Sequence, residues 1–154
     1  MKELSNSSDI AGLLRPGMRV YIGGGACEPE TFVDALREHP ESCAGVTFIQ
    51  SIVPGLTRND FASFHPDARS TTIFMSGETQ SSYANGDIDF IPMQLWVMAD
   101  YLREHPVDLA AVHLAPTGDA SVFNPGPNSD FIDAVTENAT TVLAEINAKA
   151  PAIL

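Results

Sequence analysis

Three consecutive glycines, Gly23 to Gly25, follow an apolar run of β-strand type in the stretch VYIGGGACEPE, which spans residues 20–30. Glycine carries no side chain, so such a run lets a ligand or another chain segment come close to the backbone. Neither of two common phosphate-binding motifs fits this stretch. The dinucleotide fingerprint G-x-G-x-x-G would need a third glycine where Glu28 stands, and a P-loop needs a Lys followed by Ser or Thr.

The charges that follow the glycines also disfavour a phosphate. Pro29 suits the first turn of a helix, and Glu28 and Glu30 place carboxylates at its positive end, where an anion would dock. Two interpretations remain open for the glycines. Either their backbone N–H groups hold a carbonyl or carboxylate oxygen of a small substrate, or they serve only a tight strand-to-helix turn and close packing.

The other nucleophilic and metal-ligating residue types show no catalytic spacing. Cys27 precedes a helix N-terminus, which would stabilise a thiolate, but Glu28 lies beside it and no histidine is near in the sequence. The four histidines lack ligand spacing such as H-x-x-x-H. The residue pattern therefore assigns no catalytic residue and no metal site.

The charge composition of the chain limits the kinds of molecule that it is expected to bind. The 154 residues include 20 acidic and 8 basic side chains, a formal net charge of −12, which repels nucleic acid and anionic membrane surfaces. The N-terminal stretch MKELSNSSDI lacks the apolar core of a signal peptide, and no apolar run approaches the roughly 20 residues of a membrane-spanning helix. Cys27 and Cys43 are isolated, so we expect reduced thiols in a cytoplasmic protein.

Strand-like and helix-like segments alternate along the chain. Strands are expected from residues 18, 45, 69, 108 and 140. Helices are expected over 9–14, 29–39, 93–105 and 129–139, with caps at Ser7 or Ser8 and at Ser129–Asp130. The alternation predicts one α/β domain over residues 1–154, with a largely parallel sheet and helices on both faces. The loops 23–28, 51–58, 76–87 and 116–128 then lie at the carboxyl ends of the strands, where ligands bind in such sheets.

Four stretches together resemble one protein family. They are LLRPGMRVYIGGGACEPETFVDAL, FMSGETQSSYANGDIDFIPMQL, VDLAAVHLAPTGDASVFNPGPNSDFIDAV and TTVLAEINAKAP. Their order and spacing, over residues 13–151, are similar to those of the acetyl-CoA hydrolase/transferase family, which includes 4-hydroxybutyrate CoA-transferases.

This resemblance implies a class I CoA-transferase fold and a chemistry. Family enzymes move CoA between an acyl-CoA and a small carboxylate through a glutamyl-CoA thioester, or hydrolyse the acyl-CoA. They contain two such domains in one chain and usually assemble as homo-oligomers. The glutamate nucleophile belongs to the second domain, so the resemblance implies that this chain is the N-terminal half and forms one wall of the active site. Coenzyme A and acyl-CoA are then substrates, and no tightly bound cofactor is expected. Neither Glu28 nor Glu145 is matched to the nucleophile.

The resemblance also implies a set of substrate-binding residues. The glycine-rich turn lies near the acyl or carboxylate pocket in the family, the second strand is followed by a polar residue, and a later loop has a turn that faces the active site. Ser121 stands where that loop would have a glycine. The implied residues are Gly23, Gly24, Gly25, Pro29, Ser51, Asn124 and Gly126. A non-catalytic module that binds small carboxylates or another protein remains the alternative.

Overall fold

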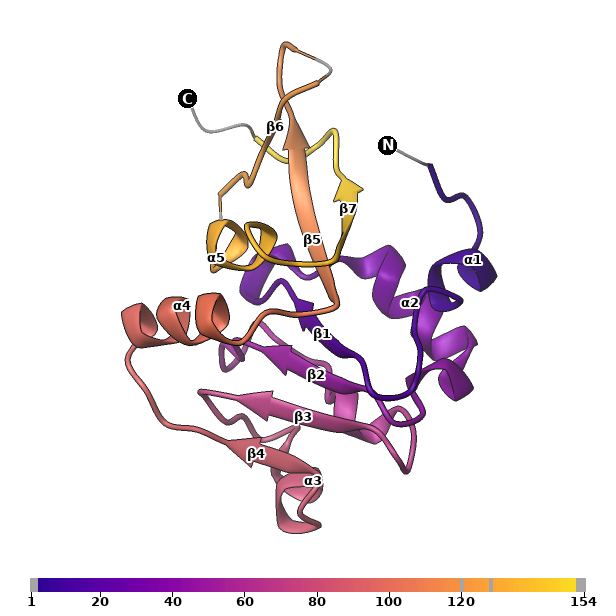
Figure 1. The fold of residues 1–154 in the computed structure, drawn as a ribbon, viewed down its shortest axis with the longest axis vertical. Coiled ribbons are helices and arrows are strands. Elements are labelled where there is room, and N and C mark those ends of the chain that lie inside the picture. Colours follow the sequence, from indigo (N-terminus) through magenta and orange to yellow (C-terminus); the bar gives the residue numbers. More distant parts are fainter. Residues whose placement is uncertain (1–2, 120, 128, 152–154) are drawn as a thin grey trace.

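The structure, a computed structural model, describes residues 3–119, 121–127 and 129–151. Within them a parallel sheet has the strand order β4-β3-β2-β1-β5-β7, and the short strand β6 pairs antiparallel with the end of β5 (Figure 1). The strands span Arg19–Ile22 (β1), Thr47–Gln50 (β2), Arg69–Thr72 (β3), Ile88–Phe90 (β4), Leu109–Pro116 (β5), Phe123–Asn124 (β6) and Thr141–Ile146 (β7). The five strands expected from the apolar runs are therefore present.

The central strand β1 is buried on both of its faces. Val20, Tyr21 and Ile22 are each 0% exposed. Because alternate residues of a strand point to opposite faces, Val20 and Ile22 belong to one hydrophobic core and Tyr21 to another. Helices α1 (Ser7–Ala11) and α2 (Glu30–Glu38) contribute to the first core, and α4 (Leu95–Glu104) and α5 (Ile132–Thr136) to the second (Figure 1). The predicted α/β fold with helices on both faces of the sheet is confirmed.

The beginnings of the helices differ from the expectation. The cap of α1 is Asn6, whose Oδ1 accepts a hydrogen bond from the backbone N–H of Asp9 at 2.7 Å, so the expected caps Ser7 and Ser8 lie inside the helix. Asn and Ser are about equally favourable as N-cap residues. The sequence therefore does not determine whether Asn6, Ser7 or Ser8 caps the helix.

The cap expected at Ser129–Asp130 is also wrong. Helix α5 begins at Ile132 after its N-cap residue Phe131, and no side-chain cap hydrogen bond is found there among the described residues. The Asp130 carboxylate is instead hydrogen-bonded to residues at the end of β1. At α2 the prediction is off by one position, since Pro29 is the cap residue and the first helical turn begins at Glu30.

Several short elements were not expected from the sequence. Helix α3 (Gln80–Ala84) and strand β4 lie in the polar segment 78–90, with the expected Asn85–Gly86 turn between them. The described residues also include the 3₁₀ helices η1 (Gly25–Cys27), η2 (Pro40–Cys43) and η3 (Phe61–Ser63). In the part of the chain that the structure describes, no helix is long and apolar enough to cross a membrane.

The sheet changes its direction of growth between β1 and β5. From β1 the chain adds β2, β3 and β4 on one side, and it then crosses through α4 to add β5 and β7 on the other side. At such a switch point the loops that follow the two neighbouring strands diverge and leave a crevice at the carboxyl edge of the sheet. The topology therefore places the expected crevice between the loops after β1 and β5, residues 23–28 and 116–128.

Candidate functional site

The glycine-rich turn after β1 is packed tightly against its neighbours. The Gly23 amide donates to the Ala111 carbonyl at 2.9 Å, and the Gly24 amide donates to Asp130 Oδ2 at 3.2 Å. A Cβ atom on Gly24 would lie 2.4 Å from the Ser51 carbonyl oxygen, and Gly25 has a φ of +62°. Two of the three amides therefore hold the fold together, and close packing alone accounts for Gly24.

The side chain of Asp130, which lies just before α5, holds this turn in place. Its Oδ2 accepts a hydrogen bond from the Tyr21 hydroxyl at 2.5 Å as well as the one from Gly24. Burial raises the pKa of the Asp130 carboxyl, and these two hydrogen bonds oppose that rise. The pKa of Tyr21 lies well above its usual value because the ring is buried and faces this carboxylate. Asp130 has a φ of 39°, a left-handed conformation that Asp and Asn tolerate better than most residues.

Glu28 is held by two amide side chains where the turn leads into α2. Its Oε1 accepts from Gln50 Nε2 at 2.8 Å and its Oε2 accepts from Asn59 Nδ2 at 2.6 Å. Partial burial raises the pKa of Glu28, although both hydrogen bonds and Arg37 favour the charged form. The carboxylate that the sequence places at the helix start is thus part of a fixed polar network.

Two cavities flank Glu28. The first has a volume of about 510 Å³ and lies between the start of α2 and the loop after β2, with Gly25, Arg37 and Arg58 in its lining. The second has a volume of about 280 Å³ and is bounded by η1 and the ends of β5 and β7, with His113, Glu145 and Lys149 in its lining. Both cavities lie at the carboxyl edge of the sheet, on the two sides of the glycine-rich turn.

The expected site residues lie in different surroundings. Gly25 lines the first cavity, and Pro29 lines a third one of about 440 Å³ between α1, α2 and β7. Gly23 and Gly24 are buried in the turn, and Ser51, the residue after β2, is buried against Gly24.

The two residues expected from the later loop form a turn of their own. Asn124 Oδ1 accepts from the Gly126 amide at 2.8 Å, and Gly126 has a φ of +72°. Pro127, the next residue, lines the second cavity. The structure therefore brings the glycines and Ser51 together, and it places Asn124 and Gly126 in a separate turn.

Residues that the sequence did not assign to the site complete this edge. Tyr21, Gln50 and Asp130, the last of them expected as a helix cap, make hydrogen bonds over long sequence separations. His113 is a polar residue within the apolar strand β5. Glu145 on β7 accepts a hydrogen bond from the Thr31 amide at 2.7 Å and so supplies the side-chain cap that α2 lacks in its own sequence.

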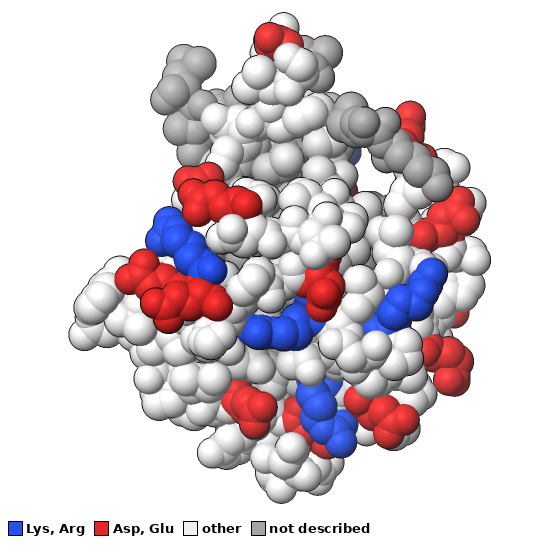
Figure 2. All heavy atoms as spheres, viewed as in Figure 1, with Lys and Arg blue, Asp and Glu red and all other residues white. Residues whose placement is uncertain are grey.

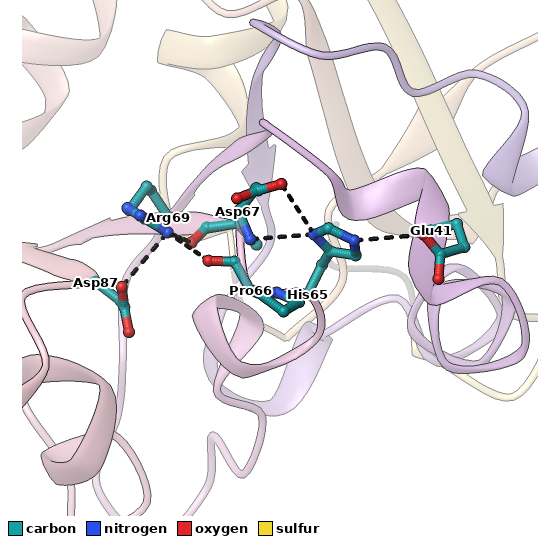
Figure 3. Close-up of polar contacts among 7 residues, drawn as sticks. Glu41, His65, Pro66, Asp67, Arg69 and Asp87 are labelled. Carbon is teal, nitrogen blue, oxygen red and sulfur yellow. Dashed lines mark hydrogen bonds and ion pairs between the residues drawn. The ribbon is translucent and has the colours of Figure 1, made fainter.

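A second polar cluster lies at the opposite edge of the sheet, before β3 (Figure 3). His65 lies between Glu41 and Asp67, with Nε2 3.4 Å from the Glu41 carboxylate and Nδ1 accepting from the Asp67 amide at 3.1 Å. Arg69 pairs with Asp87 at 3.4 Å in the same region. Among the described residues no group of three His, Cys, Asp or Glu side chains is arranged to hold a metal ion.

Basic side chains are few and scattered on the surface. On the face shown in Figure 2, Lys and Arg residues are interspersed with Asp and Glu and form no continuous basic patch. This agrees with the net charge of −12. The surface on this face offers little attraction to a polyphosphate.

The parallel sheet and its switch point define the chain as an α/β domain of the open-sheet class, and the cavities lie at the carboxyl edge, where such sheets bind ligands. The model of the acetyl-CoA hydrolase/transferase N-terminal domain matches residues 1–154, and the chain belongs to this family. The family resemblance of the sequence is thereby confirmed.

Individual relatives agree with this assignment. The chain is 27% identical to a succinyl-CoA:acetate/propanoyl-CoA:succinate CoA transferase of Fasciola hepatica, over 97% of this chain and 32% of the relative. Its fold matches RipA from Yersinia pestis with a TM-score of 0.81 and 13% identity, over 97% of this chain and 37% of that one. It also matches a 4-hydroxybutyrate CoA-transferase of Porphyromonas gingivalis with a TM-score of 0.63 and 18% identity, over 96% and 34%. The chain thus spans about a third of the length of these proteins.

Proposed function

We propose that residues 1–154 form the N-terminal domain of an acyl-CoA:carboxylate CoA-transferase or acetyl-CoA hydrolase and make one wall of its active site. The observation that carries the proposal is the position of two cavities beside the Gly23–Gly25 turn, at the switch point between β1 and β5. This is where open α/β sheets bind ligands, and the family matched over the whole chain acts on CoA thioesters.

The catalytic glutamate is proposed to lie on a second domain, outside residues 1–154. Glu28 is held by Gln50 and Asn59, and Glu145 holds the Thr31 amide, so both of these carboxylates already have structural partners. The sparse basic residues support the same division, because the phosphates of CoA need a positively charged surface that the second domain would supply.

The exposed apolar side chains suggest where the second domain docks. Phe74 and Phe90 lie at or just past the carboxyl ends of β3 and β4, and Leu95 and Trp96 begin α4. Trp96 is 67% exposed and Leu95 is 55% exposed. Large apolar side chains left in water at one end of a sheet are typical of a surface that a partner covers. In the assembled protein this partner would be the second CoA-transferase domain, as another part of the chain or as a subunit.

The assignment is tested by comparing the 154-residue chain with the protein encoded by its complete reading frame. Both are assayed for acetyl-CoA hydrolysis and for CoA transfer to acetate, propionate and succinate, and then mapped by mass spectrometry after incubation with acyl-CoA. We expect activity and a CoA adduct on a glutamate beyond Leu154 only in the longer protein. A CoA adduct on Glu28 or Glu145 would contradict the assignment of roles.

The second candidate function is a non-catalytic module that binds small carboxylates or another protein. The Gly23 and Gly24 amides are used within the fold, so a carboxylate ligand of such a module would be held by other groups of the domain. A reading frame that ends at Leu154, with no activity in any mixture, would favour this alternative. Cytoplasmic location and homo-oligomeric assembly stay predictions, which fractionation and sedimentation of the complete protein test.

A further inference from the structure

The second cavity contains a histidine whose hydrogen bonding is incomplete. His113 lies on β5, is 8% exposed and lines the cavity. Its Nδ1 is buried and has no hydrogen-bond partner among the described residues. Glu145, its register neighbour on β7, is directed to the Thr31 amide by the hydrogen bond between them. Buried polar atoms without partners are rare, and each one calls for an explanation.

The unpaired Nδ1 determines which nitrogen of a neutral His113 carries the proton. A buried N–H donor without an acceptor is more unfavourable than a buried acceptor without a donor. A neutral His113 therefore keeps its proton on Nε2, which is absent from the unpaired buried atoms. The imidazole then offers an N–H donor to a ligand in the cavity, and such a donor requires an oxygen or nitrogen acceptor.

The charges around the cavity restrict that acceptor to an uncharged group. Glu28, Glu30 and Glu145 line it with Lys149, so the lining is acidic overall. A free carboxylate would meet three like charges, and an ammonium group would present only donors to the imidazole N–H. The carbonyl of an amide or thioester is neutral and accepts a hydrogen bond, and an amide N–H in the same molecule can donate to the carboxylates.

We propose that this cavity of about 280 Å³ binds the uncharged acyl-thioester and amide end of acyl-CoA, with His113 Nε2–H donating to its carbonyl oxygen. The choice of acyl-CoA as the natural source of this group rests on the proposed function. The site itself rests on His113 and the charges of the lining. In this proposal the glycine-rich turn forms one wall of the cavity, and the His113 side chain on β5 recognises the ligand.

The test measures binding of S-acetyl-N-acetylcysteamine, an uncharged thioester with one amide, to the 154-residue chain by NMR of the imidazole nitrogens. Acetate and ethylammonium are the charged comparisons. We expect a saturable shift of the His113 resonances with the thioester, with a Kd on the order of 10 mM, and weaker binding of both ions. His113→Leu should weaken thioester binding about 5- to 10-fold, the effect of one neutral hydrogen bond, and His113→Gln should restore part of it.

Stability separates a ligand-binding role from a structural one. His113→Leu removes an unpaired buried polar atom, so its urea midpoint should equal or exceed that of the wild type. His105→Gln, at the exposed end of α4, is the matched control and should bind like the wild type. The proposal is overturned if the thioester gives no saturable shift, if acetate binds as tightly, or if His113→Leu binds like the wild type. Thioester binding by the chain together with an inactive complete protein would refute the proposed function and leave the site standing.

Discussion

Replacing Gly24 by alanine tests whether the glycine-rich turn is tightly packed against the residues that follow β2. Gly24 has extended backbone angles, φ −101° and ψ −179°, that any residue adopts, so the substitution adds no backbone strain. Its Cβ would lie 2.4 Å from the Ser51 carbonyl oxygen and 3.3 Å from Asp130 Oδ2. The first contact is with backbone, so β1 and β2 must separate locally and the Gly24–Asp130 hydrogen bond must lengthen.

The size of the effect follows from two opposing terms. Overpacking a tightly packed site costs about 1–3 kcal/mol, and this contact should lie at the upper end because a backbone atom cannot rotate away. Restricting the unfolded chain stabilises Gly→Ala variants by about 0.4–1 kcal/mol. We therefore expect Gly24→Ala to lower the free energy of unfolding by about 2 kcal/mol, which for a chain of this size lowers Tm by roughly 4–8 °C.

Urea denaturation followed by far-UV circular dichroism measures this difference. Gly77→Ala is the matched control, since none of the described residues lies within 4 Å of its Cβ position and its φ is outside the left-handed region. Its free energy of unfolding should change by no more than about 1 kcal/mol. Gly25→Ala should lie between the two, because a φ of +62° costs about 1–2 kcal/mol with a side chain. Equal unfolding free energies for Gly24→Ala and Gly77→Ala would refute the packing argument.

Four further perturbations test other parts of the candidate site. Tyr21→Phe should destabilise the fold by about 1–3 kcal/mol in urea because the buried Asp130 carboxylate loses a donor; an unchanged midpoint would contradict this. Because burial raises the pKa of Asp130, the native state holds more protons than the unfolded state, and wild-type stability falls as pH rises through the folded pKa. Asp130→Asn should therefore gain stability relative to the wild type as pH rises above about 4, the ordinary pKa of an Asp carboxyl. A difference in urea midpoints that does not change with pH would contradict a raised pKa at Asp130. Glu145→Ala removes the cap at the Thr31 amide and should cost about 0.5–2 kcal/mol of thermal stability; a change below this range would contradict a capping role. Trp96→Ala should change stability by no more than about 0.5 kcal/mol yet weaken binding of the second domain in sedimentation; unaltered binding would remove Trp96 from that interface.

The central strands β1 and β5 were predictable because their apolar residues occur in continuous runs, whereas β3 is the polar segment Arg69–Thr72 and the apolar residues expected in it follow its end. In a sheet covered on both faces, central strands such as β1 and β5 are apolar at nearly every position, and this signal does not depend on distant contacts. Helix α3 and strand β4 lack such a signal, since they lie in a segment of Ser, Asn, Asp and Gly residues. The 3₁₀ helix η1 depends on the packing of Gly24 against β2, which the local sequence does not encode.

The candidate site was predictable only in its location. The Gly23–Gly25 turn and its position after a strand follow from the sequence, but the partners of the turn do not. Asp130 has the residue type and position of a helix cap, and its actual contact with Gly24 joins residues 106 apart in the chain. His113 interrupts an apolar strand, and only the three-dimensional structure shows that its Nδ1 has no partner among the described residues.

The contacts of the turn change what the glycines imply about recognition. A carboxylate-binding loop needs backbone amides that are unoccupied, and the Gly23 and Gly24 amides are bonded to Ala111 and Asp130. The absence of side chains at these positions instead allows β1 and β2 to approach closely where the two cavities begin. Under the proposed function, ligand contacts at this edge come from side chains on the neighbouring elements, such as His113. On that proposal, packing of the turn and ligand recognition belong to different residues, so Gly24→Ala and His113→Leu should perturb stability and binding separately.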